Sequence, residues 1–277
     1  MIRHTAIEGR SIGVRSTVLM PQRPAIPKAI KRAVRQKCGF GCIICGMPFF
    51  HYDHVVSYSQ VQEHSEDNLI LLCPNHHQAK NSGLLPISKI AKAVANPHNK
   101  SRSHSAAHTL LTAGSKGQII LGSVEFTFDF ERYPSPEGFA AFVVNGTALI
   151  GMTHEDGNFL LYFYGADEDG MDSLIIERGE LVVRTDLWDY ELKGHRFIVR
   201  RRPSPKVSGK IVLDLLKLDR GFKVTSGLVL HQGYELRIKD DEITVLPQRV
   251  TIRDMGFKDC YAGISVGNPK MGFICLN

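Results

Sequence analysis

The sequence of 277 residues predicts an α+β protein in which a metal-bound N-terminal region precedes a mainly antiparallel all-β region. Three observations support this fold class. Two closely spaced pairs of metal-ligating side chains lie between Cys42 and His76. From about residue 117 onward, short runs alternate apolar and polar residues, as half-buried strands do. Several of these runs are joined by Asn-Gly or Asp-Gly, the dipeptides that favour two-residue β-turns.

The composition is that of a globular protein with room for real hydrophobic cores, since 43% of residues are hydrophobic and 22% are charged. No apolar run approaches the roughly 18 residues of a membrane helix. Arg10 and Arg15 interrupt any apolar core of a signal peptide. Three of the six cysteines fall in the ligand pairs, which argues against a disulfide framework and predicts a cytoplasmic location.

Positive charge is concentrated at the N-terminus. Residues 1–40 hold nine Lys or Arg and one acidic residue. We expect residues 1–25 to form a basic, extended arm, because Pro21, Pro24 and Pro27 prevent a long helix. Such an arm favours a polyanionic partner, and the alternative is a solvated arm without one.

A helix is predicted from Pro27, with Ile30 and Val34 on its apolar face. We expect this helix to pack on the metal-bound region and to present its basic side to a nucleic-acid backbone. The basic side chains that crowd it are Lys28, Lys31, Arg32, Arg35 and Lys37.

The first group of ligands is predicted to be a structural zinc site. Cys42-x2-Cys45 and Cys73-x2-His76 are separated by 27 residues. Zinc in a closed site takes four thiolate or imidazole ligands, and a two-residue spacer lets both members of a pair reach one ion. The alternatives are buried free thiols with a surface His76, or a redox CxxC. Cys38 is expected to be a free thiol.

A second group lies inside this frame. His54, preceded by Asp53, is expected at the edge of a short hairpin. Leu69–Leu72 is predicted to be a buried strand. His77 begins a segment free of Pro and Gly that can form a helix. The predicted order of strand, loop, strand and helix places His77 opposite Asp53 and His54.

The order Cys-x2-Cys, Asp-His and Asn-Leu-Ile-Leu-Leu-Cys-x2-His-His-x2-Lys resembles the HNH endonucleases of the ββα-metal fold in their zinc-stapled form. The resemblance covers roughly residues 28–97, and the predicted nuclease domain spans residues 26–97. The three letters of the family name correspond to His54, Asn68 and His77. One departure is His76, where the family more often has Cys, but zinc accepts either ligand.

The resemblance implies a metal-dependent endonuclease that hydrolyses DNA phosphodiester bonds, with RNA open as an alternative substrate. His54 would be the general base. Asp53 and His77 would hold a single catalytic ion, which in this family is Mg²⁺, Mn²⁺, Ni²⁺ or Zn²⁺. Asn68 would position His54 by a hydrogen bond across the loop. The alternative is a zinc-stapled nucleic-acid-binding protein without catalysis, whose β region does the recognition.

Four further polar residues lie near this group in the sequence. Asn81 follows His77 by four residues, so on a helix it could reach the metal or the phosphate. Lys80 is a candidate phosphate contact, although a solvated helix lysine is the favoured interpretation. His51 and His64 are expected to be surface histidines.

After the motif, Ser88 is predicted to cap a short helix that ends before Pro97. Residues 98–116 are rich in Ser, His and Lys and are predicted to be a linker. From residue 117 to 277 the pattern is that of an all-β domain, with a strand at 124–130 and hairpins at Asn145-Gly146 and Asp156-Gly157.

A sandwich, a barrel and a stacked-strand arrangement all fit this β pattern. Its role in targeting, sensing or oligomerisation stays open, since fold class does not decide function. A homo-oligomer is attractive, because one HNH core cuts one strand and a double-strand break needs two copies or two events.

Overall fold

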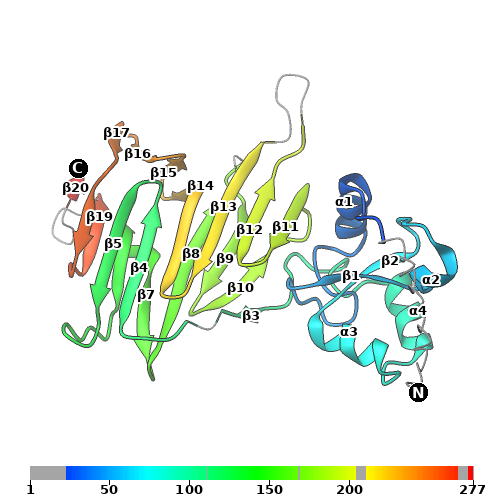
Figure 1. Cartoon of the computed structure of the whole chain (residues 1–277). Helices are drawn as coiled ribbons and strands as arrows, with labels where there is room; N and C mark the ends of the chain where they lie inside the picture. The colour runs from blue at the N-terminus through cyan, green and yellow to red at the C-terminus, as the bar shows by residue number, and fades with distance from the viewer. Residues whose placement is uncertain (1–22, 111, 168, 204–209, 268–273, 277) are drawn as a thin grey trace, which may run out of the picture.

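A computed structural model describes residues 23–110, 112–167, 169–203, 210–267 and 274–276. A small α/β region is followed by a larger region built from two β-sheets (Figure 1). This confirms the predicted α+β class. The predicted basic arm lies outside the described residues, except for Arg23, Pro24 and Ala25.

The four described helices all lie in the N-terminal region: α1 (Lys28–Lys37), α2 (Tyr58–Val61), α3 (Pro74–Asn81) and α4 (Ile87–Ala95). Helix α1 begins after Pro27, as predicted. The predicted cap of α4 is wrong, because Pro86 occupies the N-cap and Ser88 lies inside the helix. Helix α3 begins three residues before His77, because Cys73 caps it and Pro74 is accepted in the first turn.

The predicted hairpin is formed by β1 (His51–His54) and β2 (Leu69–Leu72), which pair antiparallel with His54 opposite Leu69. All four residues of β2 are buried. The connection carries the short helix α2, and α3 follows β2 directly, which gives the order strand, strand, helix. The hairpin therefore places Asp53 and His54 at the end of β1, beside the helix that carries His77.

One sheet of the β region has eight strands in the order β20-β19-β6-β7-β8-β9-β10-β3. Neighbours are antiparallel except at β6-β19 and β19-β20. Its strands are β3 (His108–Thr109), β6 (Phe139–Val144), β7 (Thr147–Glu155), β8 (Asn158–Ala166), β9 (Asp172–Glu177), β10 (Glu180–Val183), β19 (Ala262–Val266) and β20 (Ile274–Leu276).

The other sheet has ten strands and is built on the meander β11 to β17. β4 joins it by parallel pairing with β14, and β5 and β18 extend that edge. Its strands are β4 (Lys116–Leu121), β5 (Val124–Asp129), β11 (Asp189–Lys193), β12 (Arg196–Arg200), β13 (Ile211–Leu218), β14 (Gly221–His231), β15 (Tyr234–Lys239), β16 (Glu242–Leu246), β17 (Val250–Ile252) and β18 (Gly256–Lys258).

The two sheets lie face to face and enclose one hydrophobic core (Figure 1). The rings of Phe163 in β8 and Phe222 in β14 meet across it, with centroids 5.9 Å apart. The predicted hairpin turns are confirmed, since Asn145 and Asp156 adopt left-handed backbone angles (φ 48° at both) before their glycines. Of the three arrangements left open by the sequence, the observed one is a sandwich, formed by two open sheets that face each other.

Residues 98–116, the predicted linker, connect the two regions and contact both. Asn99 is fully buried and donates to the carbonyls of Gly39 and Gly46 in the N-terminal region. Further along, Ser105 pairs with Val183, and β3 adds to the edge of the eight-stranded sheet. Polar residues of this segment therefore supply hydrogen bonds to both regions.

Helix α1 joins the two regions. Arg35 is buried (3% exposed) and donates from Nε and Nη2 to the two carboxylate oxygens of Asp189 in β11, at 2.9 Å each. Arg32 lies over the Trp188 ring, 4.3 Å from its centroid. The prediction that Arg35 contacts nucleic acid is therefore corrected, since its guanidinium is enclosed between the regions. Sequence could not reveal this, because its partner lies 154 residues away.

Candidate functional site

The four predicted zinc ligands converge. Cys42 and Cys45 lie in the loop between α1 and β1, and Cys73 and His76 lie at the start of α3. Their four ligand atoms lie within 4.8 Å of one another. Cys45 Sγ is 3.8 Å from Cys73 Sγ, and Cys42 Sγ is 3.5 Å from His76 Nδ1. In a tetrahedral zinc site with bonds of about 2.0–2.3 Å, neighbouring ligand atoms are about 3.5–3.8 Å apart, so the cluster fits zinc.

The local backbone positions this cluster. Ile43 N donates to Leu71 O at 3.0 Å, which ties the cysteine loop to β2. Cys42 N donates to Met47 O at 2.9 Å and closes the turn. The three thiols interact closely: a hydrogen bond from Cys45 lowers the pKa of Cys42, the same hydrogen bond raises the pKa of Cys45, and burial raises the pKa of Cys73. Cys38 is a buried free thiol outside the cluster, as predicted.

Asp53 and His77 face each other as predicted, with 3.9 Å between Asp53 Oδ1 and His77 Nε2. Metal bonds of about 2.0–2.2 Å place two ligands of one ion about 3–4.3 Å apart, so this pair fits a shared divalent ion. The Asp53–His77 pair supplies two ligand atoms. Among the described residues, only the zinc cluster gathers three or more such side chains.

Lys80 is part of this site and not a solvated helix lysine. Its side chain is 19% exposed, and its ammonium lies 2.7 Å from Asp53 Oδ2. It also donates to the carbonyl of His54. Lys80 therefore neutralises the carboxylate that would bind an ion, and the expectation of a free lysine is corrected.

His54 is 4% exposed, at the end of β1. Its pKa is lowered, first because burial disfavours the charged ring and then because Arg23 and His64 lie nearby. A lowered pKa keeps the imidazole neutral near pH 7, which is the form that accepts a proton.

Two residues that the sequence interpretation placed elsewhere contact His54. His64 was expected on the surface, but its Nδ1 lies 3.2 Å from His54 Nε2. Arg23, assigned to the extended arm, donates from Nη2 to His54 Nδ1 at 2.7 Å. Tyr58 in α2 stacks on His64 with ring centroids 4.8 Å apart. No periodic pattern marks these three residues, because they lie in the short helix and coil around the hairpin.

Asn68 holds the loop that follows His54 through hydrogen bonds to its backbone. Its Oδ1 accepts from Val56 N at 2.7 Å, and its Nδ2 donates to Val56 O at 2.9 Å. Val55 N also donates to Asn68 O at 2.8 Å. The residue therefore closes the base of the loop from His54 to Leu69.

The remaining candidates lie around the site. Asn81 and His51 are exposed, which agrees with a surface position for His51. Of the basic side chains on α1, Lys28 is exposed, and Lys31 and Arg32 are half-buried over the rings of Tyr52 and Trp188.

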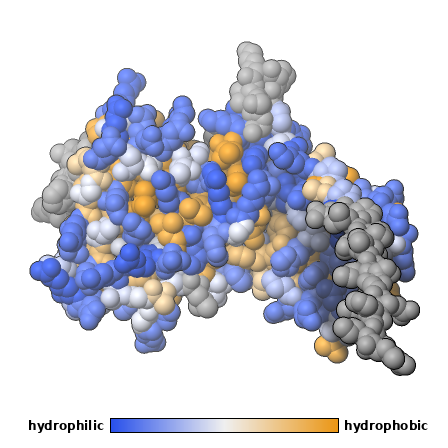
Figure 2. Space-filling model, in the orientation of Figure 1, coloured by the Kyte–Doolittle hydropathy of each residue, from blue (hydrophilic) through white to orange (hydrophobic). Residues whose placement is uncertain are grey.

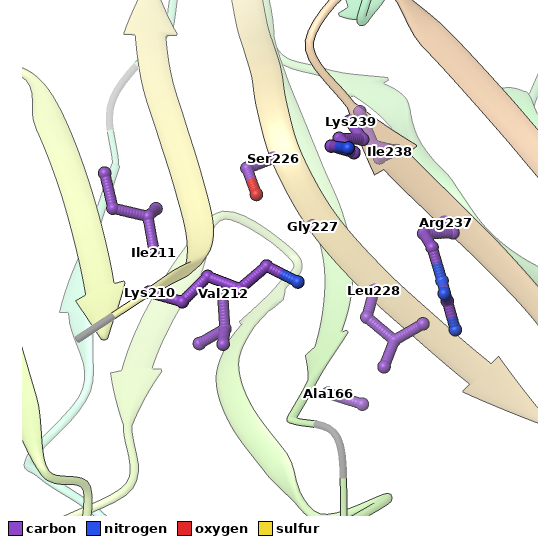
Figure 3. Close-up of a pocket in the computed structure, with 10 residues that line it drawn as sticks. All are labelled: Ala166, Lys210, Ile211, Val212, Ser226, Gly227, Leu228, Arg237, Ile238 and Lys239. Atoms are coloured by element: carbon purple, nitrogen blue, oxygen red, sulfur yellow. The ribbon is translucent and has the colours of Figure 1, made fainter. Parts of the chain in front are cut away.

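On the face of the β region seen in Figure 2, apolar side chains gather over the middle of the sheet that holds β13 and β14. A hollow of about 260 Å³ opens there between β13, β14 and β15 (Figure 3). Lys210, Arg237 and Lys239 rim it, and Val212 and Leu228 line it. Its lining residues include no His, Cys, Asp or Glu.

A family model described as HNH endonuclease matches residues 36–83, which include both groups of ligands. These residues are an HNH region with a CxxC…CxxH zinc-binding arrangement, and the β region stays unrecognised. Neither the curated proteins nor the solved structures gave a match. An HNH region implies a nuclease or nucleic-acid-binding function with a metal. None of the described helices has the length and apolar character needed to cross a membrane.

Proposed function

We propose that this protein is a metal-dependent endonuclease that hydrolyses DNA phosphodiester bonds. One observation carries the proposal. The buried His54, whose lowered pKa favours the neutral ring, lies beside an Asp53–His77 pair with the spacing of two ligands to one ion. A protein that only bound nucleic acid would have no need for a proton acceptor next to a second metal site.

In this proposal His54 takes the proton from the attacking water. Asp53 and His77 would hold a divalent ion, which would supply positive charge for the phosphate and the leaving oxygen. Asn68 keeps the backbone after His54 fixed through its two hydrogen bonds to Val56, so that the imidazole is placed before substrate arrives. By family resemblance, the products carry 5′-phosphate and 3′-hydroxyl ends.

The DNA backbone would lie along the basic side of the HNH region. Lys28, Lys31 and Arg32 on α1 are the candidate phosphate contacts, and Arg35 is excluded by its burial. Lys80 would approach the scissile phosphate from the Asp53 side, since its ammonium already lies 2.7 Å from that carboxylate. Phosphate contacts of this kind give affinity without sequence preference.

The β region is proposed to set where or when the nuclease acts, by targeting, by sensing or by pairing two copies. The ion pair between Arg35 in α1 and Asp189 joins the β region to the HNH region, which supports a role of the β region in controlling the nuclease. The alternative function is nucleic-acid binding without cleavage, with the HNH region as a zinc-stapled scaffold.

The test is incubation of supercoiled plasmid and end-labelled duplex with purified protein and Mg²⁺, Mn²⁺, Ni²⁺ or EDTA. We expect nicking that requires a divalent ion, is abolished by EDTA and leaves 5′-phosphate ends. Tight DNA binding with no cleavage under any of the ions would favour the binding alternative.

A further inference from the structure

Four polar groups form a continuous row through the candidate active site. Arg23 Nη2 lies 2.7 Å from His54 Nδ1. His54 Nε2 lies 3.2 Å from His64 Nδ1. His64 Nε2 lies 2.8 Å from the carbonyl oxygen of Pro24. Arg23 and Pro24, which are adjacent in the chain, therefore contact the two ends of the His54–His64 pair.

The hydrogen bond between His64 and the Pro24 carbonyl determines which ring nitrogens of the two histidines carry protons. A carbonyl oxygen only accepts hydrogen bonds, so His64 Nε2 carries the proton. In a neutral imidazole the other nitrogen is then an acceptor, so His64 Nδ1 must receive a proton from its neighbour. It follows that His54 Nε2 is protonated and donates to His64.

The Arg23 end is compatible with this result but does not determine it. Arg23 Nη2 lies 2.7 Å from His54 Nδ1 and 3.4 Å from His54 Nε2, so the guanidinium lies against the side of the ring and is not aimed along the Nδ1 lone pair. The tautomer with the proton on Nε2 therefore follows from the Pro24 end, and it leaves Nδ1 as the acceptor nitrogen of His54.

The rings that make this row are also held in place by packing. Tyr58 stacks on His64 at 4.8 Å and meets His54 edge to face at 5.5 Å. His54 itself is 4% exposed, so its ring has little room to turn over. Packing therefore holds the His54–His64 part of the row, while Arg23 and Pro24 at its ends are exposed.

We propose that His64 is a positioning residue for His54: it accepts the Nε2 proton and so leaves Nδ1 as the atom that takes the proton from water. This inference rests on the proposed nuclease function for its consequence. Arg23 occupies Nδ1 in this structure, and it must move before Nδ1 can accept a proton. Arginine pairs strongly with phosphate, so a bound substrate gives it another partner. His64 is then the group that still fixes the tautomer.

The direct test is ¹⁵N NMR of histidine-labelled, zinc-loaded full-length protein near neutral pH, which distinguishes the two tautomers of His54 without any need for activity. We expect the Nε2–H tautomer in the wild type and in Arg23→Met, because His64 and Pro24 still require it. In Arg23→Met/His64→Leu we expect both tautomers. An Nδ1–H tautomer in the wild type, or an unchanged spectrum of His54 in the double variant, would overturn the proposal.

A kinetic test adds the functional side. We expect His64→Leu to lower kcat by about 10- to 100-fold, as for other partners that orient a functional histidine, with KM little changed. His64→Asn, whose amide oxygen can accept the same proton, should recover most of the loss. Equal activity of His64→Leu and wild type would contradict the proposal. A wild type that cuts no DNA would refute the proposed function, while the NMR result would still decide the tautomer.

Discussion

The buried ion pair between Arg35 and Asp189 gives a prediction that tests how the two regions are joined. Both side chains are nearly inaccessible, at 3% and 1% exposed. Arg32 and Arg200 also approach the same carboxylate, at 3.4 and 3.9 Å. Asp189 therefore faces three guanidinium groups, and Asp189→Asn removes the carboxylate that compensates the buried Arg35, whereas Arg200 keeps its ion pair with Glu191 at 2.8 Å.

The size of the effect follows from this burial. Removing one partner of a buried ion pair costs about 3–5 kcal/mol, because arginine stays charged and its charge remains out of water. The chain offers a matched control on its surface, where Arg178 donates to both oxygens of Glu155 at 2.9 Å. That pair is 66% and 50% exposed, and breaking it by Glu155→Gln should cost about 0–1 kcal/mol.

The assay is equilibrium unfolding in urea. The fluorescence of Trp188, the single tryptophan in the sequence, reports on the α1 interface because Arg32 lies over its ring. Asp189→Asn should lower the unfolding midpoint strongly, and Glu155→Gln should leave it almost unchanged. Equal losses in the two variants would refute the inference that this ion pair holds α1 to the β region.

Three further predictions concern the HNH region. Cys42→Ser should lose bound zinc and the far-UV signal of the region's helices, whereas Cys260→Ser in the β region should keep both, as measured by metal analysis and circular dichroism. Asn99→Ala should lower the free energy of unfolding by about 1–3 kcal/mol in urea, because the buried Gly39 carbonyl loses its side-chain donor and the Gly46 carbonyl keeps only the one from Ala106 N. Lys80→Ala should tighten Mn²⁺ binding by about tenfold in calorimetry, because it removes a positive charge 2.7 Å from Asp53; weaker binding would contradict the competing role of this lysine.

The sequence predicted the HNH region well because its signals are local. Ligand spacing in Cys42-x2-Cys45 and the apolar run of β2 each depend on a few neighbouring residues. The turn at Asn145-Gly146 was equally clear, since a left-handed residue before glycine is characteristic of this hairpin. Once these elements form, chain connectivity alone brings His77 next to Asp53.

The errors arose from contacts between distant parts of the chain. Arg35 lies on a helix that looks basic and exposed in sequence, but Asp189, 154 residues later, encloses it. His64 was expected on the surface; it is half-buried, and the loop that carries it folds back so that its ring contacts His54. The parallel pairing of β4 with β14 was equally hidden, because only a folded sheet brings residues 118 and 221 together.

The central claim, that His54 is a catalytic base, is tested most directly by comparing His54→Ala with His51→Ala. The two histidines share β1, but His51 is exposed, and its ring lies against His77, with centroids 5.4 Å apart, and not against His54. Single-turnover cleavage of a labelled duplex should fall by at least about 100-fold in His54→Ala and change little in His51→Ala, with DNA binding and zinc content preserved in both. Equal cleavage by His54→Ala and wild type, with both proteins folded and bound to DNA, would contradict the account.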